Sequence, residues 1–127
     1  MTFEWMDYLA LAKNLSASPA SPGPEEAALR TATSRAYYAA LHLASQRAQA
    51  EGYIPTFSGD DHQGISRHFR TLGADRVRKK IASDLDRMRK SRNQADYDLT
   101  LTQTPRAMAE LTIKSAEQTI ITLVSLE

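Results

Sequence analysis

The longest unbroken helical pattern in this chain covers residues 24–52, which read PEEAALRTATSRAYYAALHLASQRAQAEG. Pro24 suits a helix start because the amide it lacks would be unpaired there, and the carboxylates of Glu25 and Glu26 favour the positive end of the helix dipole. The pattern runs to about Glu51, and Gly52 is the expected stop. Two adjoining apolar stripes predict packing neighbours on two sides. They consist of Leu29, Ala36, Ala40 and Leu43, and of Tyr37, Leu41, Ala44 and Ala48.

Two shorter helices are predicted on either side of this stretch. Residues 3–15 form an amphipathic pattern, and residues 16–24, rich in proline and serine, form a linker too short to separate domains. After a loop over residues 53–60, Asp60 or Asp61 can cap a short helix that ends before Gly73. The apolar positions are Trp5, Tyr8, Leu9, Ala12 and Leu15 in the first helix, and Ile65, Phe69 and Leu72 in the second.

The second half of the chain predicts two more helices. Asp75 can cap a basic helix that reaches about Asn93, and Thr104 with Pro105 can start the last one. Their inward positions are expected to be Val77, Ile81, Leu85 and Met88, and Ala109, Ile113, Ala116, Ile120 and Val124. The sequence therefore predicts an all-α, up-and-down bundle of four to five helices in one domain over residues 1–127.

The composition narrows the class of protein. At 127 residues, with 42% apolar and 24% charged residues, the chain is typical of one globular domain. The absence of cysteine excludes disulfides, thiolate nucleophiles and cysteine-ligated metals. No apolar run approaches the roughly 20 residues of a membrane span, and Met1 leads into the chain without a basic-then-apolar leader. We therefore expect a cytoplasmic protein without membrane contact.

Charge is unevenly distributed along the chain. Residues 62–92 carry ten basic and three acidic groups, whereas residues 1–61 carry four and seven, and residues 93–127 carry two and five. The basic middle third can present a field to phosphate or to an acidic partner protein. The alternative interpretation is a solvated helix face laced with ion pairs.

Two polar clusters are candidate sites. In residues 92–98, RNQADYD, Arg92 lies one helical step of four from Met88, so it should point inward and need a partner such as Asp96 or Asp98. The alternative is a structural ion pair that closes the helix. In residues 34–42, SRAYYAALH, the side chains of Arg35, Tyr38 and His42 share one helical face. The spacing alone favours the alternative, which is tight core packing through the small alanines with the tyrosine hydroxyls and the histidine at the rim.

The order of these motifs resembles a known family. A helix with SRAYYAA, then HQGI with a following Phe69, then Arg92-x-x-Ala95-Asp96-Tyr97 is similar to the HEPN superfamily, and most similar to its small uncharacterised prokaryotic branch. The resemblance implies a homodimer formed through the long helices, with the arginine motifs of two subunits around a shared cleft. It also implies a metal-independent attack of a ribose 2′-hydroxyl on the adjacent phosphate in the active ribonucleases.

The chain departs from the ribonuclease motif, in which four to six residues separate an arginine from the histidine that follows it. Those positions after Arg92 hold Tyr97, Asp98 and Leu99, those after Arg89 hold Gln94, Ala95 and Asp96, and no histidine follows His68. Acid–base catalysis near neutral pH favours a group that titrates there, as histidine does. We therefore expect a binding or regulatory module that recognises a nucleotide, RNA or a partner protein. Its expected cleft consists of Arg35, Tyr38, His42, Arg92, Asn93 and Asp96.

Family members of this kind occur in toxin–antitoxin systems and beside nucleotidyltransferase-like partner proteins, and by analogy Tyr97 is a candidate for modification by such a partner. One alternative is a metal-independent endoribonuclease that uses Arg92, Asn93, Asp96 or Tyr97, helped by His42 or His62 if the fold brings one of them near. Another is a purely structural helical dimer. No metal or other cofactor is predicted, because the three histidines lack the spacing of a metal site.

Overall fold

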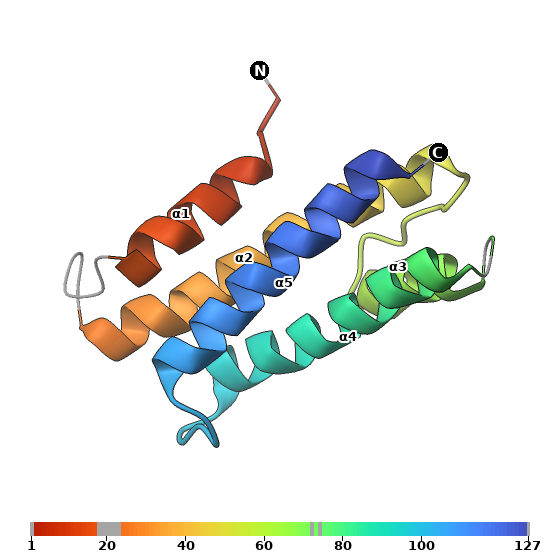
Figure 1. Ribbon diagram of the computed structural model, residues 1–127. Helices are drawn as coiled ribbons and strands as arrows, with labels where there is room; N and C mark the ends of the chain where they lie inside the picture. The colour runs from red at the N-terminus through yellow and green to blue at the C-terminus, as the bar shows by residue number, and fades with distance from the viewer. Residues whose placement is uncertain (1, 18–23, 72, 74, 127) are drawn as a thin grey trace.

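The computed structural model describes residues 2–17, 24–71, 73 and 75–126, and these residues form five helices and no strand (Figure 1). The helices are α1 (Met6–Ala17), α2 (Glu25–Ala50), α3 (Asp60–Thr71), α4 (Arg76–Tyr97) and α5 (Pro105–Ser125). In Figure 1, α2 and α5 lie side by side and run in the same direction, whereas α1 and α4 run the opposite way. The short α3 packs against α4 and α2. The all-α bundle is confirmed.

Two of the predicted helix starts are confirmed by their hydrogen bonds. The carboxylate of Asp75 accepts a bond from the amide of Arg78 at 2.7 Å, and the hydroxyl of Thr104 accepts one from the amide of Ala107 at 3.1 Å. At the end of α2, Gly52 adopts a φ of 106°, a left-handed conformation that favours glycine. The local sequence therefore sets these boundaries.

The start of α3 differs from the prediction. The carboxylate of Asp61 does not cap the helix but turns back to the preceding loop, where it accepts bonds from the amides of Thr56 and Phe57, both at 2.8 Å. It also accepts the hydroxyl hydrogen of Tyr53 at 2.7 Å. The carboxylate thereby holds the loop against α3, with Phe57 at a positive φ of 57°.

The core lies where α2 meets the other helices, and alanines allow their close approach. Ala32, Ala36, Ala40 and Ala44 are fully buried on α2. The two predicted stripes of α2 are buried except at Leu43, which is partly buried. Two predicted inward positions are wrong: Val77 is 48% exposed and Val124 is 82% exposed, and each lies in a terminal turn of its helix.

Two further expectations concern the linker after the first helix and the absence of a membrane span. Residues 18–23 of the predicted linker, and Leu72, lie outside the described residues. None of the helices in the described part of the chain combines the length and the apolar run that crossing a bilayer requires.

Helix α4 is longer than predicted, and Arg30 of α2 provides the reason. Its guanidinium donates to the carbonyls of Ala95 at 3.1 Å, Asp98 at 2.5 Å and Leu99 at 3.2 Å. The last carbonyls of a helix lack partners within the helix, so these bonds stabilise its final turn. The predicted end near Asn93 is therefore wrong, and the motif from Arg92 to Tyr97 is helical.

Candidate functional site

Arg92 lies near the end of α4 and reaches across to α2. Its Nη2 donates to the hydroxyl of Tyr38 at 2.5 Å, and its Nη1 donates to Oδ1 of Asn93 at 2.7 Å. Only 17% of the side chain is exposed, and the guanidinium lies 5.1 Å from the centre of the Tyr38 ring. Arg92 therefore points inward and has polar partners, as its helical spacing predicts.

Asp96 supplies the negative charge beside Arg92. Its Oδ2 lies 3.1 Å from Nε of Arg92 in an ion pair, although this N–H is not aligned for a hydrogen bond. The same oxygen accepts a bond from the hydroxyl of Ser34 at 3.2 Å, so Asp96 also ties α4 to α2. The other expected partner, Asp98, is not used: the described residues show no ion pair between its carboxylate and Arg92.

The predicted face on α2 is present. The guanidinium of Arg35 lies between two tyrosine rings, 4.7 Å from the centre of Tyr8 and 5.0 Å from that of Tyr38. The ring of His42 stacks on Trp5, with centroids 3.6 Å apart and an angle of 11° between the planes. Helix α1 and the residues before it therefore cover the His42 end of this face.

His62 joins this group from α3, which the sequence left open. Its Nδ1 lies 2.5 Å from the hydroxyl oxygen of Tyr37, and its ring centre lies 6.1 Å from that of Tyr38. The ring of His42 lies 5.9 Å from Tyr38 as well. Both histidines thus lie beside the tyrosine that binds Arg92, although neither hydrogen-bonds Arg92 within the described residues.

The surroundings favour the neutral form of both imidazoles. Burial lowers the pKa of His62, and the positive charges of Arg89 and Arg92 lower it further. Burial, followed by the charge of Arg35, lowers the pKa of His42. Both rings are therefore uncharged at pH 7, and the field at His62 is positive.

The hydrogen bond between Tyr37 and His62 fixes the tautomer of His62. Burial raises the pKa of the Tyr37 hydroxyl far above its usual value, so this hydroxyl keeps its proton. Because a buried hydroxyl needs an acceptor, it donates to Nδ1 of His62. Nε2 then carries the ring proton and is a hydrogen-bond donor.

We define the Arg92 cluster as the side chains that α2, α3 and α4 bring together here: Ser34, Arg35, Tyr38, His42, His62, Arg92, Asn93 and Asp96. It contains two guanidinium groups against one carboxylate, with two neutral imidazoles. Such a set can hold an anion through arginine and imidazole N–H groups. The described residues contain no group of three or more histidine, aspartate or glutamate side chains that could hold a metal ion.

Tyr97 lies beside this cluster. The residue is 75% exposed, and its ring centre is 5.8 Å from the guanidinium of Arg92. The ring is therefore accessible to a ligand or to a modifying partner.

Sequence reasoning left one contributor open and missed two. His62 was named only as a remote possibility, because a lone histidine at the start of a short helix has no spacing relation to Arg92. Arg30 and Trp5 act through contacts with distant segments, which local periodicity does not reveal.

A scan against protein-family models and searches of curated proteins and of solved structures find no match to this chain. The function therefore rests on the site itself.

Proposed function

We propose that this chain is a HEPN-like binding module that holds a phosphate group of a nucleotide or RNA at the Arg92 cluster. The observation that carries the proposal is the charge around His62. Burial is the largest cause of the lowered pKa of this imidazole, and the charges of Arg89 and Arg92 lower it further, while Asp96 is the carboxylate that pairs with Arg92. A site with surplus positive charge and imidazole donors is suited to a phosphate.

The geometry of Arg92 favours recognition of this kind. Tyr38 and Asn93 each use one hydrogen of a terminal guanidinium nitrogen, and each of these nitrogens carries a second hydrogen. The contacts hold the guanidinium in one orientation before a ligand arrives, which reduces the entropy lost on binding. Binding is favoured over catalysis because the position of the motif histidine holds Tyr97, Asp98 or Leu99.

The resemblance adds a biological setting to the proposal. In that setting the protein is a cytoplasmic homodimer whose two clusters face a shared cleft, as in toxin–antitoxin systems. A nucleotidyltransferase-like partner would modify Tyr97, whose exposed ring makes it reachable. Light scattering coupled to gel filtration tests the dimer, which the proposal expects at twice the mass of one chain.

The test of the phosphate site is Arg92→Gln, with Arg76→Gln as the control. Arg76 is an exposed arginine on the same helix, and the described residues place no carboxylate in an ion pair with it. Losing a charged hydrogen bond of about 1.5–3 kcal/mol should weaken binding of a labelled oligoribonucleotide roughly 10- to 100-fold. The control should stay within a factor of about three. Equal affinities for all three proteins, with RNA and with nucleoside phosphates, would falsify the proposal.

The position of His62 supports a second candidate, a metal-independent endoribonuclease. Two neutral imidazoles beside the tyrosine that binds Arg92 are groups that can accept and donate protons near pH 7. This candidate predicts RNA cleavage in the presence of a chelator, with 2′,3′-cyclic phosphate ends, and loss of cleavage in His62→Gln. Intact RNA after prolonged incubation with the unmodified protein contradicts it.

A further inference from the structure

A groove runs along the side of the molecule where α3 faces α4. Its first part has a volume of about 460 Å³ and is lined by Gln63, Ser66, Arg67, Arg70, Asp86 and Arg89. Its second part, about 700 Å³, shares Gln63, Asp86 and Arg89 with the first and extends past Lys90 and Asn93 to Tyr97 and Asp98. The shared residues make the two parts continuous, and Asn93 connects the groove to the Arg92 cluster.

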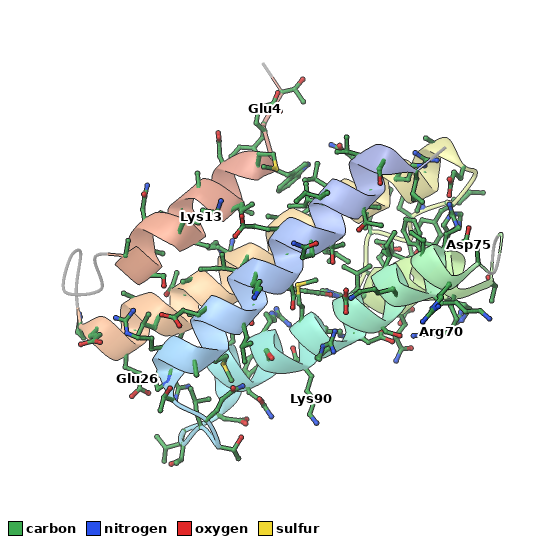
Figure 2. The ribbon with its side chains drawn as sticks, in the orientation of Figure 1. Glu4, Lys13, Glu26, Arg70, Asp75 and Lys90 are labelled. Carbon is green, nitrogen blue, oxygen red and sulfur yellow. The ribbon has the colours of Figure 1, made fainter. Side chains whose placement is uncertain are left out.

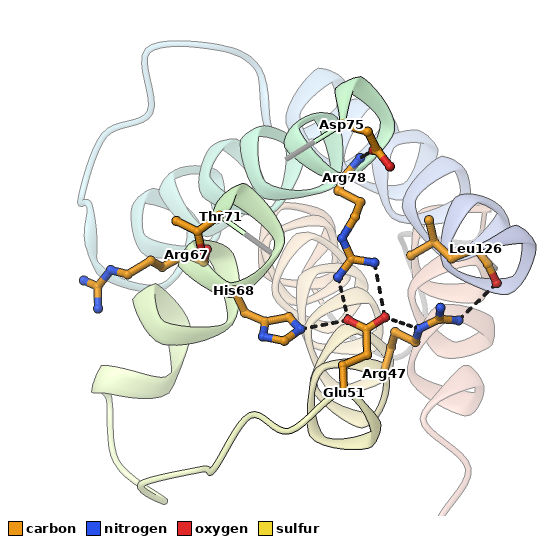
Figure 3. Close-up of polar contacts among 8 residues, drawn as sticks. All are labelled: Arg47, Glu51, Arg67, His68, Thr71, Asp75, Arg78 and Leu126. Carbon is orange, nitrogen blue, oxygen red and sulfur yellow. Dashed lines mark hydrogen bonds and ion pairs between the residues drawn. The ribbon is translucent and has the colours of Figure 1, made fainter. Parts of the chain in front are cut away.

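The groove has a net positive charge. Asp86 is neutralised by Arg70 at 2.7 Å and accepts a bond from Ser66. By contrast, no carboxylate of the described residues lies within ion-pair distance of Arg67, Arg89 or Lys90. Figure 2 shows Lys90 projecting from α4 into solvent, and Figure 3 shows Arg67 pointing away from the neighbouring polar contacts.

The length of the groove exceeds that of a single nucleotide. Its lining on α4 runs from Asp86 to Tyr97, which at the helical rise of 1.5 Å per residue is about 16 Å. At a rise of about 3.4 Å per nucleotide, this length spans roughly five nucleotides of a stacked strand. The groove therefore fits a short strand.

The two ends of the groove differ in chemistry, and the difference sets which part of a strand lies where. Arg67 at one end, and Arg89 and Lys90 along the middle, attract phosphates. At the other end the carboxylate of Asp98 repels a phosphate but can accept a bond from a base amino group. The exposed ring of Tyr97 beside it offers a surface on which a base can stack.

From this arrangement we infer that the α3–α4 groove binds a single-stranded nucleic acid, with phosphates over Arg67, Arg89 and Lys90 and a base stacked on Tyr97. This inference rests on the proposed function, because the strand would deliver one of its phosphates to the Arg92 cluster. It goes further by naming a polynucleotide, rather than a mononucleotide, as the ligand.

The experiment compares two double variants that remove the same charge. Arg67→Gln with Lys90→Gln alters the groove, whereas Arg76→Gln with Lys79→Gln alters exposed positions on α4 outside it. Binding of a labelled single-stranded decaribonucleotide should weaken roughly tenfold in the groove variant, and the slope of log affinity against log salt should fall by about 1.4. The matched control should change less than about threefold, and adenosine monophosphate should bind all three proteins equally.

A third variant tests the stacking surface. Tyr97→Leu should weaken decaribonucleotide binding roughly tenfold, whereas Tyr97→Phe, which keeps the ring, should retain it. A deoxyribonucleotide of the same sequence should compete with the RNA, because the groove contacts phosphates and a base, whereas a polyglutamate peptide should not. Displacement of the RNA by the peptide at equal concentration overturns the inference in favour of an acidic protein partner.

The outcomes separate this inference from the proposed function. If both double variants weaken RNA binding equally while Arg92→Gln abolishes it, the groove inference fails and the phosphate site remains. If Arg92→Gln also binds the decaribonucleotide and the mononucleotide as the unmodified protein does, or if that protein binds neither, both fail.

Discussion

Arg78 and Arg92 lie near opposite ends of helix α4, and their polar contacts differ. We define the Glu51 cluster as Arg47, Glu51, His68 and Arg78, shown in Figure 3. Arg78, only 8% exposed, donates to both oxygens of Glu51, at 2.5 and 3.2 Å. At the other end, fourteen residues or about 21 Å along the helix, Arg92 faces the carboxylate of Asp96 with its Nε–H out of line.

The difference lies in how the charged groups are paired. Around Glu51, two arginines and a histidine converge on one carboxylate, and together they join the ends of α2, α3 and α4. Around Arg92, the Nε–H has no hydrogen-bond acceptor among the described residues, and burial together with the charges of Arg89 and Arg92 lowers the pKa of His62. The closed cluster stabilises the fold, whereas the open one retains capacity for an anion. Four predictions test this division, in order of the effect expected.

Glu51→Gln should destabilise the protein most, by about 3–5 kcal/mol, because it leaves the buried Arg78 without its charge partner. Urea unfolding followed by circular dichroism measures the loss. Binding of the oligoribonucleotide at a temperature where the variant is folded should remain unchanged. A loss below about 1 kcal/mol would mean that the cluster behaves like an ordinary surface ion pair.

The pH dependence of stability should also trace to Glu51. Hydrogen bonds from Arg78, followed by those from Arg47 and His68, lower the pKa of Glu51 from 4.5 to about 2. A lowered carboxyl pKa stabilises the fold above the unfolded value, so about 3 kcal/mol is lost as pH falls from 4.5 toward 2.

Urea unfolding at several pH values between 2 and 7 measures this loss of stability. Asp61, whose pKa is also lowered to about 2, contributes in the same direction, so the difference from Glu51→Gln isolates the Glu51 share. Parallel pH profiles for the two proteins would contradict the assignment.

Arg92→Gln should affect stability less than Glu51→Gln, by about 1 kcal/mol, because Asp96 keeps its bond from Ser34 and is partly exposed. Thermal unfolding of both variants under one condition gives the ranking. The reverse order would make Arg92 the structural arginine and leave the helical dimer as the better description.

The smallest effect should be the pH dependence of ligand binding. A phosphate beside His62 favours the imidazolium, so it raises a pKa that the free protein holds below 6.5. Affinity should therefore increase as pH falls from 7.5 to 5.5, by roughly threefold to tenfold. Calorimetry at the two pH values measures this change in affinity. His62→Gln should remove the pH dependence. If the variant keeps the same pH dependence, a group other than His62 is responsible.

The sequence predicts what depends on neighbours along one helix. The caps at Asp75 and Thr104 and the shared face of Arg35, Tyr38 and His42 all follow from local spacing, and the structure contains each of them. The final turns are different, since Val77 and Val124 keep the helical period but remain exposed.

The features that the sequence did not predict depend on contacts between residues far apart in the chain. The end of α4 depends on Arg30, 65 residues before the carbonyl of Ala95 that it binds. The Glu51 cluster gathers side chains from three helices, none of which has a charge pattern that reveals the others. His62 reaches Tyr37 and Tyr38 only because α3 folds back on α2.

The most direct measurement of the central claim is an NMR titration of the imidazole of His62, assigned with His62→Gln. We predict a pKa below 6.5 in the free protein and a clear rise when a saturating decaribonucleotide is added, because the phosphate then offsets the charges of Arg89 and Arg92. A pKa of His62 that is the same with and without bound RNA would contradict the account.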